Sequence, residues 1–299
     1  MTSSGNTKGF QDFAREVRPE IDTALGQLGT LGSDCPDRLR EAMLYSLLAP
    51  GKRLRPMLSI LAAEACDGKR TDAMPAGCAV EMIHAYSLIH DDLPAMDDDD
   101  LRRGRPTCHK QFDEATAILA GDALLTLAFE MLVREIRPAG SAAECCKLLA
   151  IAAGGCGMVG GQADDIDAPG REPTPELLDA IHARKTGALI RCSLELGAVT
   201  ADATSKQREA LVEYGRLIGL TFQITDDLLD VRSDEATMGK RVGKDSELGK
   251  LTFPGMYGIE ESVRRATQLT DRAVTCLDIF GNNADLLQEL AVFILERNR

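Results

Sequence analysis

The sequence lacks tryptophan, is poor in aromatic residues and has no excess of positive charge. Aromatic residues make up 4% of the 299 residues, and hydrophobic residues as a whole make up 44%. This composition, in which alanine and leucine are abundant, is typical of a soluble globular protein rich in helix. The 34 Lys and Arg residues are outnumbered by 47 Asp and Glu residues, which gives a net charge of −13. That sign argues against a nucleic acid partner, because phosphate backbones are bound through basic surfaces.

Paired cysteines, export signals and membrane segments are missing as well. None of the nine cysteines belongs to a C-x-x-C pair, and this odd number predicts reduced, mostly buried thiols. The N-terminus has no apolar signal region, and no run of 18 apolar residues occurs without a charge or a helix breaker. We therefore expect a cytoplasmic protein without a membrane span.

Apolar residues recur at helical spacing almost from end to end, and no alternating run of β-branched residues is long enough for a strand. The expected helices cover residues 10–29, 36–49, 54–68, 73–93, 113–137, 142–158, 175–199, 205–232, 258–280 and 284–296. The glycine-rich stretch 154–161 lacks the features of a phosphate loop and predicts a close approach of helices. Because no linker or repeat divides the chain, we predict an all-α, single-domain helical bundle over residues 1–299. We expect a central active-site cavity and a flexible segment at residues 1–8.

The first unusual feature is a cluster of six aspartates within residues 91–100. Asp91 and Asp92 end an apolar helical stretch, and Pro94 then disfavours helix and bends the chain toward Asp97. Carboxylates at a helix C-terminus face the negative end of the helix dipole, which typically costs ~0.3–1 kcal/mol each, and neighbouring aspartates also repel one another. A bound cation would offset both costs.

A second cluster, Asp226, Asp227 and Asp230, lies inside a later helix, where spacings of three and four place the carboxylates on one face. Most aspartate runs are solvated surface, but both clusters follow strongly apolar helical stretches. Ligands that are all oxygen suit Mg²⁺, which keeps several waters and bridges one or two carboxylates to substrate phosphates. The sequence therefore predicts a site for more than one Mg²⁺ ion, formed by Asp91, Asp92, Asp97, Asp226, Asp227 and Asp230.

Basic residues that could hold an anion lie just before a third helix. Lys52, Arg53 and Arg55 precede Pro56 at an early helical position and predict a compact cationic site with backbone donors nearby. His84 lies two helical turns before Asp91 and so on the same face. His90 and His182 are instead expected to be packed core residues.

Short motifs follow one another along nearly the whole chain. They are G-K-R-L-R-P at 51–56, D-D-x-x-x-x-D at 91–97 followed by R-R-G-R-P-T at 102–107, G-G-Q-x-x-D at 160–165, K-T at 185–186, F-Q-x-x-D-D-x-x-D at 222–230 and G-K-D-x-x-x-x-K-x-T at 243–252. Together they resemble the trans-isoprenyl diphosphate synthase family, and within it the bacterial-type farnesyl diphosphate synthases. One such motif is only suggestive, but the ordered set is highly specific.

The resemblance implies two diphosphate substrates and a role for each remaining polar group. Isopentenyl diphosphate would be bound by Lys52, Arg55, His84 and Arg103. The allylic diphosphate would be reached by Arg102 and lined by Lys185, Thr186, Gln223, Lys240 and Lys250. Oxygen atoms of Lys185 and Thr186, with the amide of Gln223, would have a catalytic role, because their dipoles can lie beside a developing carbocation without trapping it.

The implied activity is a magnesium-dependent condensation of isopentenyl diphosphate with dimethylallyl and geranyl diphosphate by a homodimer. Tyr86 and Ser87, about one turn before Asp91, should form the floor of the tunnel that holds the growing tail, and the bulk of Tyr86 favours the C15 product, farnesyl diphosphate. A geranyl or geranylgeranyl diphosphate synthase remains an alternative, as does a non-catalytic subunit that modulates a partner synthase. A terpene cyclase fits less well, since it has no use for an isopentenyl-binding cluster.

Overall fold

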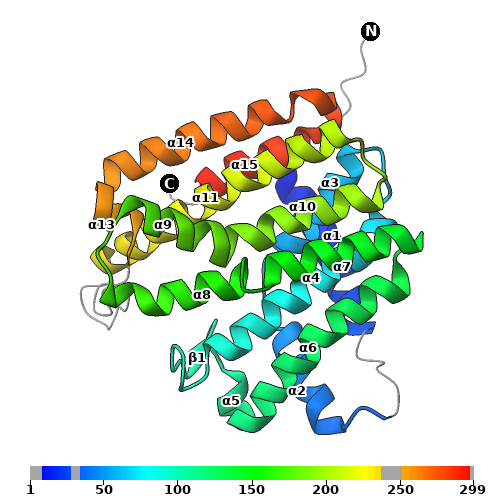
Figure 1. The fold of residues 1–299 in the computed structure, drawn as a ribbon, viewed down its shortest axis with the longest axis vertical. Helices are drawn as coiled ribbons and strands as arrows, with labels where there is room; N and C mark the ends of the chain where they lie inside the picture. Colours follow the sequence, from blue (N-terminus) through cyan, green and yellow to red (C-terminus); the bar gives the residue numbers. More distant parts are fainter. Residues whose placement is uncertain (1–8, 28–33, 237–250, 297–299) are drawn as a thin grey trace.

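The computed structural model describes residues 9–27, 34–236 and 251–296. The segment 1–8 that was predicted to be flexible and the expected ligands Lys240 and Lys250 lie outside these residues. Within the described ranges the protein is all-α, as predicted, apart from one short hairpin (Figure 1).

The helices have the following bounds: α1 Phe10–Gln27, α2 Asp37–Leu47, α3 Leu54–Ala65, α4 Arg70–Asp91, α5 Cys108–Gln111, α6 Glu114–Glu135, α7 Ala139–Ala153, α8 Met158–Asp167, α9 Pro175–His182, α10 Ala188–Thr200, α11 Ser205–Ala236, α13 Phe253–Tyr257, α14 Ile259–Cys276 and α15 Asp285–Glu296. A π-helical segment, Ala183–Gly187, joins α9 to α10. Strands β1, Leu101–Arg102, and β2, Arg105–Pro106, form the antiparallel hairpin.

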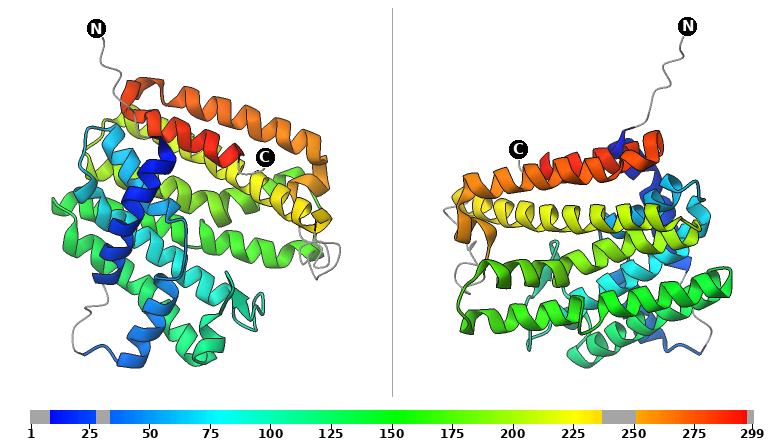
Figure 2. Two further views of the ribbon diagram at one scale, coloured as in Figure 1. Left: turned by 180° about the vertical axis from the view of Figure 1, so that it is seen from behind. Right: turned by 45° about the horizontal axis from the view of Figure 1, so that its top comes forward.

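Helix α10 lies in the middle of the bundle, where it contacts α3, α4, α7 and α11. Its residues are mostly apolar, and ten of its 13 residues are buried, as expected for a helix surrounded by others. Helix α14 packs along α11, and α4 packs along α6 (Figures 1 and 2). The main hydrophobic core runs from Phe10 on α1 to Ile294 on α15. A second cluster packs around the part of α11 that carries the second aspartate cluster, and it consists of Leu178, Ile224, Leu228, Phe253 and Ala266.

Two sequence-based expectations need correction. The helix predicted over 142–158 ends at Ala153, because Gly154 is extended (φ −79°, ψ −163°), and a separate helix, α8, begins at Met158 after Gly157, which is also non-helical (φ −123°, ψ −130°). The hairpin was not expected, since two-residue strands are too short to show alternation. Its turn residues Arg103 and Gly104 have φ of 53° and 77°, the left-handed values that two-residue hairpin turns of type I′ require.

Two stretches, Glu114–Glu135 and Ala139–Gly170, are long and apolar enough to cross a membrane by length and composition alone. This is weak evidence for a span, because core helices of soluble proteins meet the same criterion. Here α6 packs against α4, and α7 packs against α10. The expectation of no membrane span stays a prediction.

Candidate active site

A cavity of about 580 Å³ opens beside the C-terminal end of α4, between α4, α6, α8 and the π-helical segment. Most of its wall is apolar, and its polar groups include Arg55, His84, Asp91, Lys185 and Thr186. A cavity of this size, with a few polar groups in an apolar wall, is typical of a small-molecule site.

Asp91 is the last residue of α4, and the chain folds back behind it as the proline bend predicts. The backbone carbonyl of Asp91 accepts a hydrogen bond from the backbone N–H of Asp97 at 2.9 Å, which brings the two residues together. Burial raises the pKa of Asp91 to about 6, and Lys185 opposes this rise while Asp97 adds to it. The first cluster therefore presents the carboxylate of Asp91 to the cavity, and the positive charge near this carboxylate does not fully balance it.

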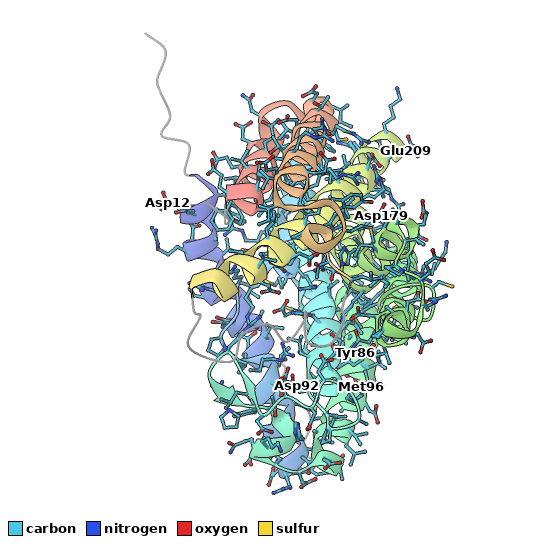
Figure 3. All side chains as sticks on the ribbon, turned by 90° about the vertical axis from the view of Figure 1, so that its left-hand side faces the viewer. Asp12, Tyr86, Asp92, Met96, Asp179 and Glu209 are labelled. Carbon is cyan, nitrogen blue, oxygen red and sulfur yellow. The ribbon has the colours of Figure 1, made fainter. Side chains whose placement is uncertain are left out.

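Asp92, which is labelled near Tyr86 and Met96 in Figure 3, is bound differently from Asp91. Only 3% of it is exposed, and both of its carboxylate oxygens accept hydrogen bonds from Arg102 of the hairpin, at 2.6 to 3.0 Å. Burial raises the pKa of Asp92, and Arg102 acts against that rise. The structure thus pairs one expected metal ligand with the arginine expected to reach the allylic diphosphate.

The compact cationic site predicted at Lys52, Arg53 and Arg55 is not compact. Arg53 has a left-handed φ of 51° at the start of α3, is only 5% exposed, and donates hydrogen bonds to Asp22 (2.7 Å) and Glu81 (3.1 Å). These carboxylates raise the pKa of Arg53, although burial acts in the opposite direction. Arg53 is therefore part of an internal ion-pair network, which sequence spacing alone cannot reveal.

The side chains expected to bind isopentenyl diphosphate are distributed over neighbouring cavities. Arg55 and His84 line the main cavity, whereas Arg103 lines a smaller one of about 60 Å³ that shares His84 with it. Lys52 lines a third cavity, of about 400 Å³, formed by α1, α3, α11 and α15. His84 therefore connects the cavities of Arg55 and Arg103, and Lys52 stands apart.

Arg55 is a half-buried cation with incomplete bonding. Its Nε is buried and has no hydrogen-bond partner within the described part of the chain. Burial lowers the pKa of Arg55, and the nearby Arg103 adds to this effect. Burial and the surrounding arginines also bring the pKa of His84 well below its ordinary value, so the ring is neutral. An anion is the ligand that such a group of donors lacks.

Lys185 and Thr186 lie in the π-helical segment, an irregularity that is frequent at functional sites. Helix α8 passes so close that a Cβ atom at Gly161 would lie 2.2 Å from the backbone nitrogen of Lys185, which confirms the close helix approach predicted for the glycine-rich stretch. Lys185 Nζ lies 2.6 Å from Asp165 Oδ2. Asp165 ends the G-G-Q-x-x-D motif at 160–165, but the sequence alone did not predict that it pairs with Lys185.

A chain of hydrogen bonds runs from the cavity wall to the second aspartate cluster. Thr186 Oγ1 donates to Gln223 Oε1 (3.0 Å), and Gln223 Nε2 donates to Asp227 Oδ1 (3.0 Å). The backbone N–H of Phe253 donates to Asp227 Oδ2 (2.9 Å). Burial raises the pKa of Asp227 to about 7 despite these two hydrogen bonds. The two aspartate clusters thus border one site, with Thr186 and Gln223 between them.

The prediction that Asp226, Asp227 and Asp230 share one face of α11 is wrong in one respect. Asp226 is partly exposed and Asp230 is exposed, and they lie four residues apart on one face. Asp227 is only 7% exposed, and both of its oxygens accept hydrogen bonds inside the protein. The residue next to Asp226 points about 100° away around a helix, which is why Asp227 faces Phe253 instead.

No group of three or more His, Cys, Asp or Glu side chains within the described ranges is arranged to hold a metal ion. Among the predicted ligands, Asp91 and Asp97 lie on one side of the site and Asp226 and Asp230 on the other, and all four are carboxylates. Mg²⁺ fits this donor set, because one or two carboxylates with waters and substrate phosphates complete its coordination. The raised pKa of Asp91 also indicates a place where a divalent cation would be stabilised.

Comparison with known proteins assigns the family. The sequence model described as polyprenyl synthetase matches residues 36–278. This chain belongs to the polyprenyl synthetase family. The resemblance to trans-isoprenyl diphosphate synthases is thereby confirmed, and the protein is a short-chain trans-prenyltransferase.

Relatives within the polyprenyl synthetase family carry different product names. The chain is 46% identical over 295 residues to a farnesyl diphosphate synthase of Bacillus subtilis (strain 168), which covers 98% of this chain and 99% of that protein. It is 43% identical over 266 residues to a geranylgeranyl diphosphate synthase of Cyanophora paradoxa, with coverages of 88% and 89%. An apo crystal structure of an FPP/GFPP synthase from Zymomonas mobilis matches with a TM-score of 0.85 at 40% identity, over 96% and 98% of the two chains. Identity therefore does not fix the product length.

Proposed function

We propose that this prenyltransferase is a farnesyl diphosphate synthase, which condenses isopentenyl diphosphate with dimethylallyl and then geranyl diphosphate. The observation that carries the proposal is one cavity with an apolar wall, a carboxylate edge at Asp91 and a half-buried, incompletely bonded cation at Arg55. Such a cavity matches a substrate with a hydrocarbon tail and a diphosphate head. The farnesyl- and geranylgeranyl-forming relatives support the substrate class.

Arg55 and His84 are proposed to hold isopentenyl diphosphate. The guanidinium of Arg55 would donate charge-assisted hydrogen bonds to diphosphate oxygens, which would compensate the charge that burial leaves unmatched. Neutral His84 would donate one hydrogen bond to the same group. Arg103 and Lys52 stay in the proposal as ligands that approach from the neighbouring cavities.

The allylic diphosphate is proposed to bind between the two aspartate clusters. Asp91, Asp97, Asp226 and Asp230 would hold Mg²⁺, which neutralises diphosphate charge and assists ionisation as a Lewis acid when bound. Asp92 would then act mainly by orienting Arg102, because its oxygens already accept from that guanidinium. Lys185 would add a positive charge at the cavity wall. Lys240 and Lys250, which lie outside the described residues, stay in the proposal as ligands of the same diphosphate.

Ionisation breaks the allylic C–O bond and leaves a carbocation beside Thr186. Because the Thr186 hydroxyl donates its proton to Gln223, its oxygen lone pairs are left to face the cavity that Thr186 lines. This fixed dipole would stabilise the cation without attacking it. The double bond of isopentenyl diphosphate then forms the new C–C bond, and the departed diphosphate accepts the proton that is lost.

We attribute the proposed C15 product to side chains that line the end of the cavity. Tyr86 and Ser87 both line it, and Tyr86 is only 7% exposed. A bulky ring there would stop the tail after two additions to the C5 starter. A geranyl- or geranylgeranyl-forming enzyme would differ only in the depth of this cavity.

We also propose that residues 1–299 form one domain and that the protein is a cytoplasmic homodimer. Exposed apolar side chains on α6 and α7, namely Leu119, Val133 and Ile151, are consistent with a surface that a second copy covers. Size measurement in solution by light scattering tests this state, and a strictly monomeric protein would contradict it.

The deciding experiment supplies isopentenyl diphosphate with dimethylallyl or geranyl diphosphate, in the presence of Mg²⁺ or a chelator, and measures product masses. We expect extension in C5 steps that requires Mg²⁺ and ends mainly at C15. Asp91→Asn should abolish it, whereas Asp72→Asn, the same change in an exposed residue at the other end of α4, should not. If the protein alone never extends the allylic substrate, the enzymatic proposal fails and a non-catalytic subunit becomes the better account.

A further inference from the structure

His90 is the last residue before the first aspartate cluster, and it lines the main cavity together with Tyr86. The two residues are one helical turn apart on α4, and their ring centroids are 5.7 Å apart at an interplanar angle of 73°. The edge of one ring therefore meets the face of the other. The expectation that His90 is an ordinary core residue overlooks this position on the cavity wall.

The ring of His90 is fixed from the side of α6. Its Nε2 lies 3.1 Å from the carbonyl oxygen of Ile118, so this nitrogen carries the proton and donates it. The space for the ring exists because residue 121 is glycine: a Cβ atom there would lie 2.1 Å from Nε2. Two features of α6, a carbonyl and a missing side chain, thus seat the imidazole that Tyr86 packs against.

We propose that His90, seated on α6 at Gly121, is a further residue that determines product length, because it holds the Tyr86 ring across the end of the tail cavity. The inference rests on the proposed function, since it assigns a role within the same site. Without the imidazole, Tyr86 loses its neighbour and can rotate away, and the volume of the imidazole itself is added to the cavity. A side chain at residue 121 would have the opposite effect, because it pushes the imidazole toward the cavity.

The test is a double-mutant cycle of His90→Ala and Gly121→Ala, read out as the distribution of product lengths. His90→Ala should raise the ratio of C20 to C15 product roughly tenfold, the scale on which a few methylenes matter in an apolar pocket. Gly121→Ala should shift products toward C10. The double variant should behave like His90→Ala alone, because the imidazole that the added methyl group would displace is then absent.

Gly140→Ala on α7 is the matched control, since no atom lies within 4 Å of a Cβ atom built there, and it should keep the wild-type distribution. His90→Gln, which can still donate to Ile118 but lacks the ring, covers the case in which His90→Ala does not fold and should also lengthen the product. Active His90 variants with wild-type product lengths would overturn the inference. So would a Gly121→Ala effect that persists without His90. If the wild-type protein does not extend any allylic diphosphate, the proposed function itself has failed.

Discussion

Replacement of Asp227 by asparagine tests both the electrostatics and the hydrogen-bond order of the site. The pKa of Asp227 is raised by burial to about 7, from an ordinary value of 3.8. When ionised, this buried carboxylate therefore costs the folded state about 4 kcal/mol relative to the unfolded chain. Because the folded state binds the proton more tightly, stability is highest below the unfolded pKa and falls as pH rises toward about 7.

Asparagine does not ionise, so the stability of the variant should not fall in this way as pH rises. The difference between the unfolding free energies of Asp227→Asn and the wild type should rise by about 2 kcal/mol, in favour of the variant, between about pH 5.5 and about pH 8. Urea unfolding in the presence of a chelator measures this difference. Asp230→Asn on the same helix is the control, because its side chain is exposed and the same change of charge should produce no such trend. Parallel pH profiles for wild type and Asp227→Asn would refute the account.

The same variant should lose activity for a different reason. The backbone N–H of Phe253 can only donate, so the asparagine oxygen must face it, and the asparagine NH₂ then faces Gln223. Gln223 must flip and donate to Thr186. The hydroxyl of Thr186 then keeps its hydrogen but points it toward the cavity. A positive hydrogen would face the carbocation, and kcat should fall roughly 10²- to 10³-fold with little change in KM. A wild-type kcat would show that the order of this chain does not matter.

Three further changes test other parts of the site. Tyr86→Ala should release longer products, and an unchanged C15 distribution by chromatography would sink the proposed tunnel floor. Arg55→Met should raise the KM for isopentenyl diphosphate roughly 10- to 100-fold, since a charge-assisted hydrogen bond is worth about 1.5–3 kcal/mol. The variant should not be less stable than the wild type, because it removes a cation whose buried Nε has no hydrogen-bond partner among the described residues, and a lower thermal midpoint would contradict this. Apparent Mg²⁺ affinity should rise with pH through the pKa of Asp91, about 6, because the metal competes with the proton, and a flat profile in Mg²⁺ titrations of activity would exclude Asp91 as a ligand.

The long helices and the location of the site were predictable because helical periodicity and ordered motifs extend over many residues. The proline bend at residue 94 also predicted the return of Asp97 to the end of α4, since the effect of proline on the residue before it is local. The break at Gly157 and the two-residue hairpin strands were missed, because a few residues carry too little pattern to be recognised.

Side-chain partners were the least predictable part. Arg53 and Arg55 are two residues apart and chemically identical, yet Arg53 is in ion pairs with Asp22 and Glu81 while Arg55 faces the cavity. The left-handed backbone at Arg53 and the positions of distant helices determine this difference, and neither appears in a local pattern. Asp227 shows the same limit, because its partner Phe253 lies 26 residues away.

The π-helical segment between α9 and α10 sets how the faces of these two helices are rotated relative to each other. A π turn holds one residue more than an α turn, so the faces of α9 and α10 are offset by about 100° relative to those of an unbroken helix. Deletion of one residue from Ala183–Gly187 would restore a regular helix but rotate one half against the other. Either the packing of α10 on α3 or the orientation of Lys185 and Thr186 would then be lost. Because of this one extra residue, one continuous helical stretch can pack α10 into the hydrophobic core and also place polar side chains in the site at its junction with α9.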